Sequence, residues 1–191
     1  VYEGLARGDA DGVLAGPTTA LGDDTVFSVW HPEMTRLRMD LGRPRHPAQI
    51  VLTERGDLPV HQAPLYNEPS LRVMVIASTT GAAALQPRLP GRPWVEVIDA
   101  GQPVDLRRAL GVLYTRGIKV ISAIGGRRAA ASLLRAGAVA ELYLTTSPRT
   151  GGEAGTPLVE GVLPRHDVLL EKKGRGSERG VRFQHLLFRA V

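Results

Sequence analysis

The sequence predicts an α/β protein built on a largely parallel sheet. Apolar runs typical of strands alternate with segments of helical periodicity, which is the pattern of βαβ units. Several of these runs are apolar almost throughout, as strands covered on both faces must be. A pair of glycines, Gly125 and Gly126, joins one such run to a helix. The expected strands are 12–15, 49–52, 72–77, 94–98, 119–124 and 141–146.

Two amphipathic crossover helices are expected between these strands. In 104–116, apolar residues recur at positions i, i+3, i+4 and i+7, with Asp105 as a plausible N-cap and Gly117 at the C-terminal position. The segment 127–136 forms the second helix and is closed by Gly137. Both helices have the length and spacing that crossovers between parallel strands require.

The end of the chain changes character and predicts an antiparallel hairpin at one edge of the sheet. Two strand-like runs, 166–172 and 181–190, are joined by the polar loop 173–180. The apolar run Leu186–Phe188 is hard to leave on a free surface, so we expect a homodimer.

The composition is that of a globular protein, and we expect one domain over 1–191. Of the 191 residues 43% are hydrophobic and 23% charged, with neither a long apolar run nor a signal peptide, which favours a cytoplasmic protein without a membrane partner. Cysteine is absent, and the five histidines lack metal-ligand spacing, so no metal site is expected. The net charge of +5 is spread over scattered arginines with few aromatics, so we expect no nucleic-acid partner.

Two segments carry residues suited to binding a phosphorylated ligand. Gly125 and Gly126 allow close approach of an anion to the backbone, and the helix that follows directs its unpaired N–H groups to the same point. Behind the strand that ends in Gly16, hydroxyl and carboxylate residues such as Thr19 and Asp23 follow at the strand's carboxyl end. Both segments also fit plain structural roles, as a tight turn and as helix caps.

A series of short motifs spans residues 7–158 in a fixed order. They are Arg7-x-x-Ala-Asp-Gly-Val-Leu-Ala-Gly16, Thr19-x-x-x-Asp23-Asp24, Gly42-Arg-Pro-Arg45, Ile50-Val-Leu-Thr-Glu-Arg55 with Leu58-Pro59, Ile124-Gly-Gly126, and Leu142-Tyr-Leu-Thr-Thr-Ser-Pro148 with Gly151-Gly152 and Thr156-Pro-Leu158. In this order the chain resembles the reductase domain of the riboflavin-biosynthesis deaminase/reductase family, which has the dihydrofolate reductase fold.

The resemblance implies a small-molecule substrate and a hydride-transfer reaction. The activity it implies is NADPH-dependent reduction of the ribose of 5-amino-6-(5-phosphoribosylamino)uracil to ribitol; NADH is left open as the cofactor. It implies cofactor-binding residues Thr19, Asp23, Thr53, Arg55, Gly125, Gly126, Arg127 and Arg128, with 126–132 around the pyrophosphate, and substrate-binding residues Arg7, Phe27, Trp30 and Ile124. It names no catalytic residue in this chain.

Three departures from the family pattern bear on substrate and cofactor. Trp30 replaces an arginine that pairs with phosphate, and Ile124 replaces a glutamate that contacts substrate. Glu54 replaces a hydroxyl residue near the 2′-phosphate of NADPH, which its charge would repel unless Arg55 or another cation intervenes. Reduction of a pterin or a small carbonyl or imine compound, and a non-catalytic nucleotide-binding role, therefore stay open.

The N-terminal residues differ from the start of the family's reductase domains. Members of the family begin with a strand and a Ser-x-Asp-Gly-type loop that line the nicotinamide and substrate sites. Here residues 1–5 already resemble the helix that follows this element. We expect the strand to lie outside the given sequence, because a sheet without a central strand would expose unpaired backbone groups.

Overall fold

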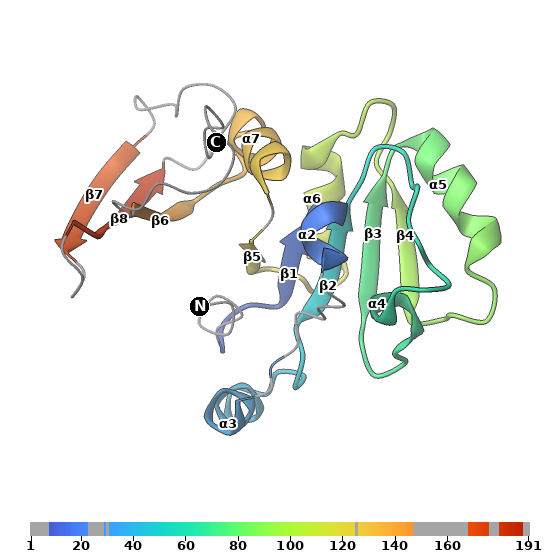
Figure 1. The fold of residues 1–191 in the computed structure, drawn as a ribbon, viewed down its shortest axis with the longest axis horizontal. Helices are drawn as coiled ribbons and strands as arrows, with labels where there is room; N and C mark the ends of the chain where they lie inside the picture. The colour runs from blue at the N-terminus through green and yellow to red at the C-terminus, as the bar shows by residue number, and fades with distance from the viewer. Residues whose placement is uncertain are drawn as a thin grey trace. The chain divides into compact units, whose positions relative to one another are not determined.

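The computed structural model describes residues 8–22, 29, 31–124, 126–146, 168–175 and 180–188. The chain divides into two compact units, unit 1 (1–129) and unit 2 (130–191), and each is described by itself. The expectation of one domain over 1–191 stays a prediction. Figure 1 shows the elements of both units in chain order.

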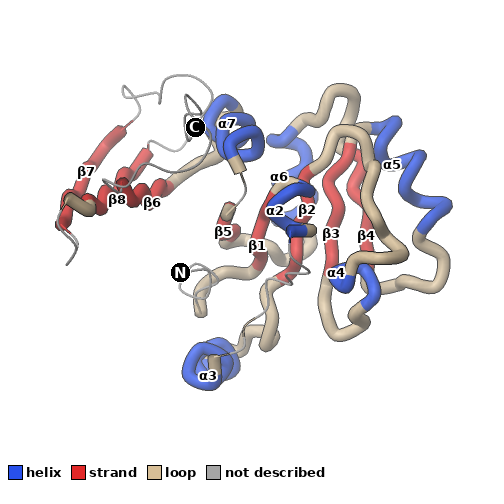
Figure 2. The backbone as a smooth tube through the Cα atoms, in the orientation of Figure 1, coloured by secondary structure: helices blue, strands red, loops and turns tan. Residues whose placement is uncertain are grey.

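Unit 1 is built on a five-stranded parallel sheet, which confirms the predicted fold class (Figures 1 and 2). Every neighbouring pair in the sheet is parallel, and the strand order is β4-β3-β2-β1-β5. The strands are β1 (Gly12–Ala15), β2 (Ala48–Leu52), β3 (Val73–Ala77), β4 (Val95–Asp99) and β5 (Ile121–Ala123). All five therefore end at the same edge of the sheet, which we call the carboxyl edge.

The order of the strands reverses once, at β1. From β1 the chain adds β2, β3 and β4 on one side, and it then returns to place β5 on the other side of β1. The connections that leave β1 and β5 thus diverge, and in open α/β sheets a ligand crevice forms at the carboxyl ends of two such strands. A ligand site is consequently expected at the carboxyl ends of β1 and β5.

Both predicted helices are present with the expected ends, but only the first crosses between parallel strands, because the second leads from β5 to a strand of another sheet. Asp105 accepts a hydrogen bond from the backbone N–H of Arg108 at 3.0 Å, and Gly117 has a positive φ of 84°. The second helix ends before Gly137, whose φ is 62°. The helices of the chain are α2 (Pro17–Ala20), α3 (Pro32–Asp40), α4 (Pro64–Asn67), α5 (Thr79–Leu85) with the 3-10 turn η2 (Gln86–Arg88), α6 (Leu106–Thr115) and α7 (Arg127–Arg135).

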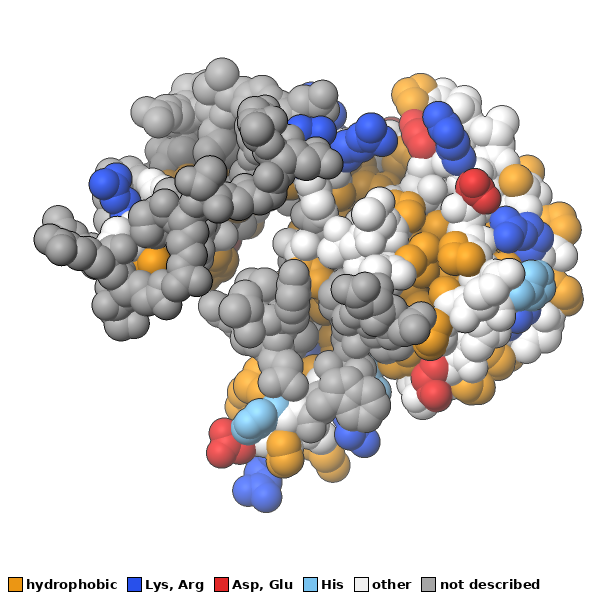
Figure 3. All heavy atoms as spheres, viewed as in Figure 1, with side chains coloured by type: hydrophobic (Ala, Val, Ile, Leu, Met, Phe, Trp, Pro, Cys, Tyr) orange, Lys and Arg blue, Asp and Glu red, His pale blue; other side chains and the backbone are white. Residues whose placement is uncertain are grey.

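Helix α3 is absent from the sequence prediction, and much of its surface is exposed. Leu37, Met39 and Leu41 are 45%, 65% and 55% exposed, and apolar and charged side chains are mixed on this helix (Figure 3). Arg38 is the exception, because it is 1% exposed and donates to the carbonyls of Ala10 and Pro44 at 2.7 and 2.9 Å. The helix is therefore held to the rest of unit 1 by a buried arginine together with the apolar contact of Met34.

The three inner strands of the parallel sheet, β1, β2 and β3, are buried on both faces. On one face Ala15, Val51 and Val75 pack in a cluster with Leu65 and Tyr66 of α4. The opposite face carries Leu14, Ile50, Met74 and Ile76, which are at most 1% exposed. Two-sided burial explains why these strands are continuous apolar runs in the sequence.

Unit 2 contains a three-stranded antiparallel sheet of β6 (Glu141–Thr146), β8 (Arg182–Phe188) and β7 (Val168–Arg175), in that order. The predicted C-terminal hairpin is confirmed as β7 and β8. The structure corrects its placement, because β8 pairs with β6 and not with the edge of the parallel sheet. The same pairing removes 141–146 from the predicted parallel strands. An apolar run indicates a strand but carries no information about its partner.

The β6–β8 pair is fastened by side chains across the strands. Tyr143 lies opposite His185, and their rings stack at 4.2 Å with an interplanar angle of 8°. Glu141 Oε2 accepts from the Tyr143 hydroxyl at 2.7 Å and contacts His185 Nε2 at 2.9 Å. In the apolar run nearby, Leu186 and Phe188 are buried, so two of the three residues that motivate the homodimer are already covered. The homodimer stays a prediction.

Within the described ranges, the helices are too short or too polar to cross a membrane.

Asp11 fastens the opposite, amino edge of the parallel sheet. Its Oδ2 accepts the backbone N–H groups of Lys119 and Val120, both at 2.8 Å, and its Oδ1 pairs with Arg43. One carboxylate thus joins the start of β1, the start of β5 and the loop before β2. Burial alone would raise the pKa of Asp11, but the hydrogen bonds from Val120 and Lys119 and the nearby Arg43 lower it below the ordinary 3.8.

We predict that Asp11→Asn lowers the free energy of unfolding by about 1–3 kcal/mol, the scale of hydrogen bonds to a charged group. Because the folded-state pKa of Asp11 is depressed, its contribution is complete above the unfolded-state pKa and is lost as the pH falls through the folded-state value. Urea unfolding of both proteins from neutral to strongly acidic pH should show the difference shrinking on acidification. The exposed Asp57→Asn serves as control, and an equal loss there would contradict the assignment.

Candidate functional site

The structure brings together Thr19 and Gly126 at the carboxyl ends of β1 and β5. A Cβ added at Gly126 would lie 3.5 Å from Thr19 Oγ1, and a Cβ added at Gly16 would meet no atom within 4 Å. The two strand ends are held side by side, because the N–H of Ile124 donates to the carbonyl of Leu14 at 2.9 Å. Two residues predicted to bind the cofactor, Thr19 and Gly126, thus lie side by side, next to the strand end at Gly16, where the backbone is uncrowded.

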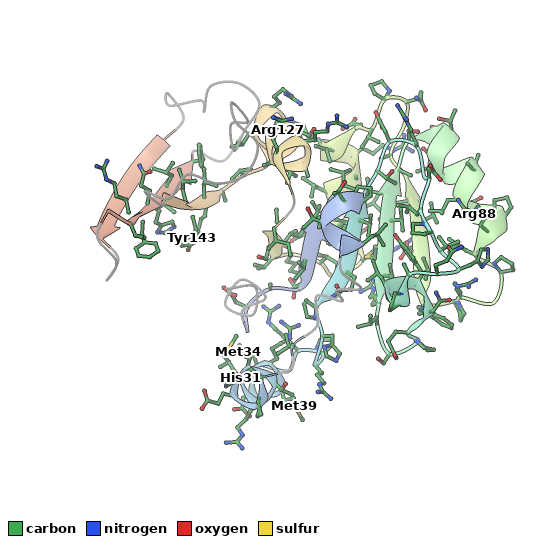
Figure 4. The ribbon with its side chains drawn as sticks, in the orientation of Figure 1. His31, Met34, Met39, Arg88, Arg127 and Tyr143 are labelled. Carbon is green, nitrogen blue, oxygen red and sulfur yellow. The ribbon has the colours of Figure 1, made fainter. Side chains whose placement is uncertain are left out.

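Gly126 stands directly before Arg127, the first residue of α7, which is labelled in Figure 4. The first N–H groups of a helix have no partner within the helix, and the helix dipole adds positive potential at that end. Arg127 and Arg128 occupy the first turn and are partly or fully exposed. This end of α7 has the chemistry of an anion site, as the glycines and basic residues predict.

Ile124 gives the site an apolar side. Its side chain packs with Val13 and Val29, and Met34 of α3 joins the same cluster. Ile124 also contacts the larger core cluster of the sheet. The residue predicted to contact substrate therefore lies next to Gly126 in apolar surroundings.

Of the two predicted cofactor-binding residues that follow β2 in the chain, one is buried and one is exposed. Thr53 is 8% exposed, and its Oγ1 accepts from the N–H of Gly56 at 3.3 Å, so its hydroxyl shapes the turn. Arg55 is exposed at the same turn. Thr53 thus acts on the site through the turn that it holds, whereas Arg55 is open to a ligand.

A hydrogen-bond network along the carboxyl edge was missed by the sequence prediction. Ser78 Oγ donates to the carbonyl of Glu54 at 2.5 Å and accepts from the N–H of Gly81 at 3.1 Å. Thr79 Oγ1 donates to Asp99 at 2.8 Å, and Thr80 Oγ1 donates to Gln102 at 3.0 Å. The signal that could have found it is the run of three hydroxyl residues directly after strand 72–77.

Two carboxylates belong to this network. Both carboxylate oxygens of Glu54 lie within reach of the N–H of Val104, at 3.3 and 3.4 Å. Asp99 accepts from the N–H of Gly101 at 2.9 Å as well as from Thr79. The hydrogen bonds from Gly101 and Thr79 lower the pKa of Asp99 below its ordinary value, so this group is ionised at neutral pH.

Gly56 and Gly81 bring the turn behind β2 into direct backbone contact with α5. Gly56 has a φ of 65°, and a Cβ at either glycine would lie only 2.2 to 2.5 Å from a backbone oxygen of the other segment. This close approach fixes the backbone that carries Glu54 and Arg55.

The remaining predicted site residues, Arg7, Asp23, Phe27, Trp30 and Gly125, lie outside the described residues. In the described part of the chain, His, Asp and Glu side chains form no group of three that could hold a metal ion.

The fold and the position of the site define an α/β protein of the dihydrofolate reductase-like class, with its candidate site where the strand order reverses. The chain matches the RibD C-terminal domain over residues 4–179 and belongs to that family. Membership of this family supports a reductase role.

Solved structures with the same fold share little sequence with this chain. A pyrimidine reductase-like protein from Corynebacterium diphtheriae superposes with a TM-score of 0.74 at 24% identity, over 99% of this chain and 79% of that one. The riboflavin biosynthesis reductase of Saccharomyces cerevisiae gives 0.69 at 15% identity, over 96% and 77%. A diaminohydroxyphosphoribosylaminopyrimidine deaminase/5-amino-6-(5-phosphoribosylamino)uracil reductase from Thermotoga maritima gives 0.63 at 15% identity, over 96% of this chain but only 46% of its own.

We predict that Gly81→Ala destabilises the protein by about 2–4 kcal/mol although alanine is the better helix former, because the added Cβ meets the backbone of Glu54 at 2.5 Å. Gly111→Ala is the matched control, since Gly111 lies within α6 and an added Cβ meets no atom within 4 Å. That change should raise stability by about 0.5–1 kcal/mol. Thermal unfolding of both variants checks the contrast, which equal effects would refute.

Proposed function

We propose that this chain is a reductase domain that binds a reduced nicotinamide dinucleotide at the carboxyl ends of β1 and β5. The observation that carries the proposal is the proximity of Thr19 and Gly126 at the two strand ends where the strand order reverses, beside the uncrowded Gly16. Family membership supports the same class of reaction. The resemblance implies NADPH as the cofactor, with NADH as the alternative.

The described residues fit a dinucleotide. At Gly16 and Gly126 the absence of a side chain leaves room for a ligand against the backbone. In the proposed complex, Gly126 and the first turn of α7 bind the pyrophosphate, and Arg127 and Arg128 add positive charge. Thr19 offers a hydroxyl to the same ligand. When bound, the reduced dinucleotide supplies a hydride, which is the chemistry that the chain's own side chains lack.

The chain's contribution to the reaction is to position the reactants and to exclude water. Ile124, which precedes Gly125 and Gly126 and packs on the buried Val13 and Val29, gives this side of the site an apolar residue, and in this proposal it keeps water from one side of the reacting groups. The proton that follows the hydride comes in this proposal from water or from the N-terminal element that the family places at the site. Arg7 faces the substrate, as the resemblance implies.

The substrate proposed first is 5-amino-6-(5-phosphoribosylamino)uracil, whose ribose would be reduced to ribitol. The second candidate is a different substrate, such as a pterin or a small carbonyl or imine compound. Ile124 favours it, because an apolar residue packed with Val13 stands where the family pattern has a carboxylate. A non-catalytic nucleotide-binding role is the third candidate.

One experiment separates these candidates. The purified chain is titrated with NADPH and NADH by calorimetry, and the phosphorylated pyrimidine is then offered with the cofactor that binds. Binding with turnover supports the first substrate. Binding without turnover favours the second or the third candidate, and turnover of a pterin or a small carbonyl or imine compound then separates these two. If neither dinucleotide binds, the reductase proposal is wrong.

We predict that Gly126→Val weakens dinucleotide binding by about 1–3 kcal/mol, because a branched side chain occupies the space that the pyrophosphate needs. The added Cβ meets Thr19 Oγ1 at an ordinary contact distance of 3.5 Å, so the fold should tolerate the change. Gly111→Val on α6 is the control and should leave the dissociation constant unchanged. Unaltered affinity in Gly126→Val would refute the site.

We predict that Trp30→Arg raises turnover of the phosphorylated pyrimidine, because an arginine can pair with a phosphate that an indole cannot neutralise. An increase of about tenfold in kcat/KM is the scale of one charge-assisted contact. The dephosphorylated pyrimidine is the control substrate and should not gain. Efficient turnover by the unmodified chain, with Trp30→Arg neutral or harmful, would restore the plain family function.

A further inference from the structure

We propose that Glu54 selects against a 2′-phosphate, so that this chain binds NADH in preference to NADPH. The inference rests on the proposed function, because it concerns the adenosine end of the same dinucleotide. The preference proposed here, for NADH, differs from the NADPH that the family resemblance implies.

Glu54 lies where the adenosine ribose of such a dinucleotide would reach. It follows β2, and β2 is the neighbour of β1 on the side away from β5. Two strand spacings of about 4.8 Å separate the ends of β5 and β2, so the turn behind β2 is roughly 10 Å from Gly126. In doubly wound folds an acidic residue at a strand end beside the dinucleotide accepts a ribose hydroxyl, and we place Glu54, behind β2, in that role.

The carboxylate of Glu54 is held in place. The carboxylate accepts a hydrogen bond from the backbone N–H of Val104, a residue 50 positions away in the sequence. The backbone carbonyl of Glu54 accepts from Ser78 Oγ at 2.5 Å. The backbone contact between Gly56 and Gly81 fixes the turn as well. The backbone of Glu54 is therefore fixed at this edge, and the hydrogen bond from Val104 orients its exposed carboxylate there.

The hydroxyls that could receive a phosphate already have acceptors. Thr79 donates to Asp99, and Thr80 donates to Gln102. Asp99 is itself ionised, so the ends of β2 and β4 carry two fixed negative charges. A ribose diol can donate to a carboxylate, whereas a phosphate dianion is repelled by it.

Two cations face the same edge and have to be weighed. Arg108 lies near Asp99 and Gly101 and offsets the charge of Asp99. Arg55 is exposed on the turn that carries Glu54, and it is the side chain that could attract a 2′-phosphate instead. The preference between NADH and NADPH thus depends on the balance of Glu54, which repels a 2′-phosphate, and Arg55, which attracts it. Of these two side chains, Glu54 is the one that the hydrogen bond from Val104 orients.

The test measures binding to the full 191-residue chain by calorimetry at one low ionic strength, with NADH, NADPH, ADP and 2′-phosphorylated ADP as probes. The two adenosine probes report the 2′ position without any need for turnover. We expect the unmodified chain to bind the unphosphorylated member of each pair about tenfold more tightly. Glu54→Gln, which keeps an acceptor for Val104, should bring the two members within about twofold, and Glu54→Ser should act in the same direction.

Glu68→Gln is the matched control. It removes the same charge, but Glu68 precedes β3 at the opposite end of the sheet, where it accepts from the N–H of Ser70. For this variant the ratio of the affinities for the unphosphorylated and the 2′-phosphorylated probe should equal that of the unmodified chain. Arg55→Gln should widen the preference for the unphosphorylated probes.

Two results would overturn the inference, and they are distinguishable. If NADPH binds as tightly as NADH or more tightly, and Glu54→Gln leaves the ratio unchanged, Glu54 has no selective role while the proposed reductase function stands. If none of the four probes binds, the proposed function fails and the inference fails with it.

Discussion

The structure depends on the parallel pairing of β1 with β2 on one side and β5 on the other. This pairing brings together segments more than 100 residues apart, so that Thr19 and Gly126 border the same space. Asp11 supports it from the amino edge by accepting N–H groups at the start of β5. A change that separated β5 from β1 would therefore remove the proposed anion site together with the edge of the sheet.

A second constraint is the backbone contact between the turn behind β2 and the start of α5. Gly56 and Gly81 permit an approach that any side chain would prevent, and Ser78 adds a hydrogen bond to the carbonyl of Glu54. The result is an edge whose charges are fixed before a ligand arrives. Fixed charges are selective because they cannot relax around the wrong ligand at small cost.

The family and the local chemistry inform different levels of function. Membership of the RibD C-terminal domain family supports the reaction class, and the geometry at Gly126 agrees with a dinucleotide. In the functions proposed here, specificity rests on residues where this chain departs from the family pattern. Ile124 makes one side of the site apolar, and Glu54 makes another negative. A substrate and a cofactor that tolerate both features are the ones the site would select.

The sequence by itself determined what depends on neighbours along the chain. Continuous apolar runs predicted the strands of the parallel sheet, and the cap at Asp105 with Gly117 predicted α6, because burial and capping leave local patterns. The position of Gly126 at the start of a helix was also predicted, because a strand, two glycines and a helical segment follow one another in the sequence. Only the tertiary structure decided that β6 pairs with β8 rather than with a parallel strand, and that Val104 holds Glu54. Strand partners and contacts between distant loops are set by packing, of which a local pattern carries no record.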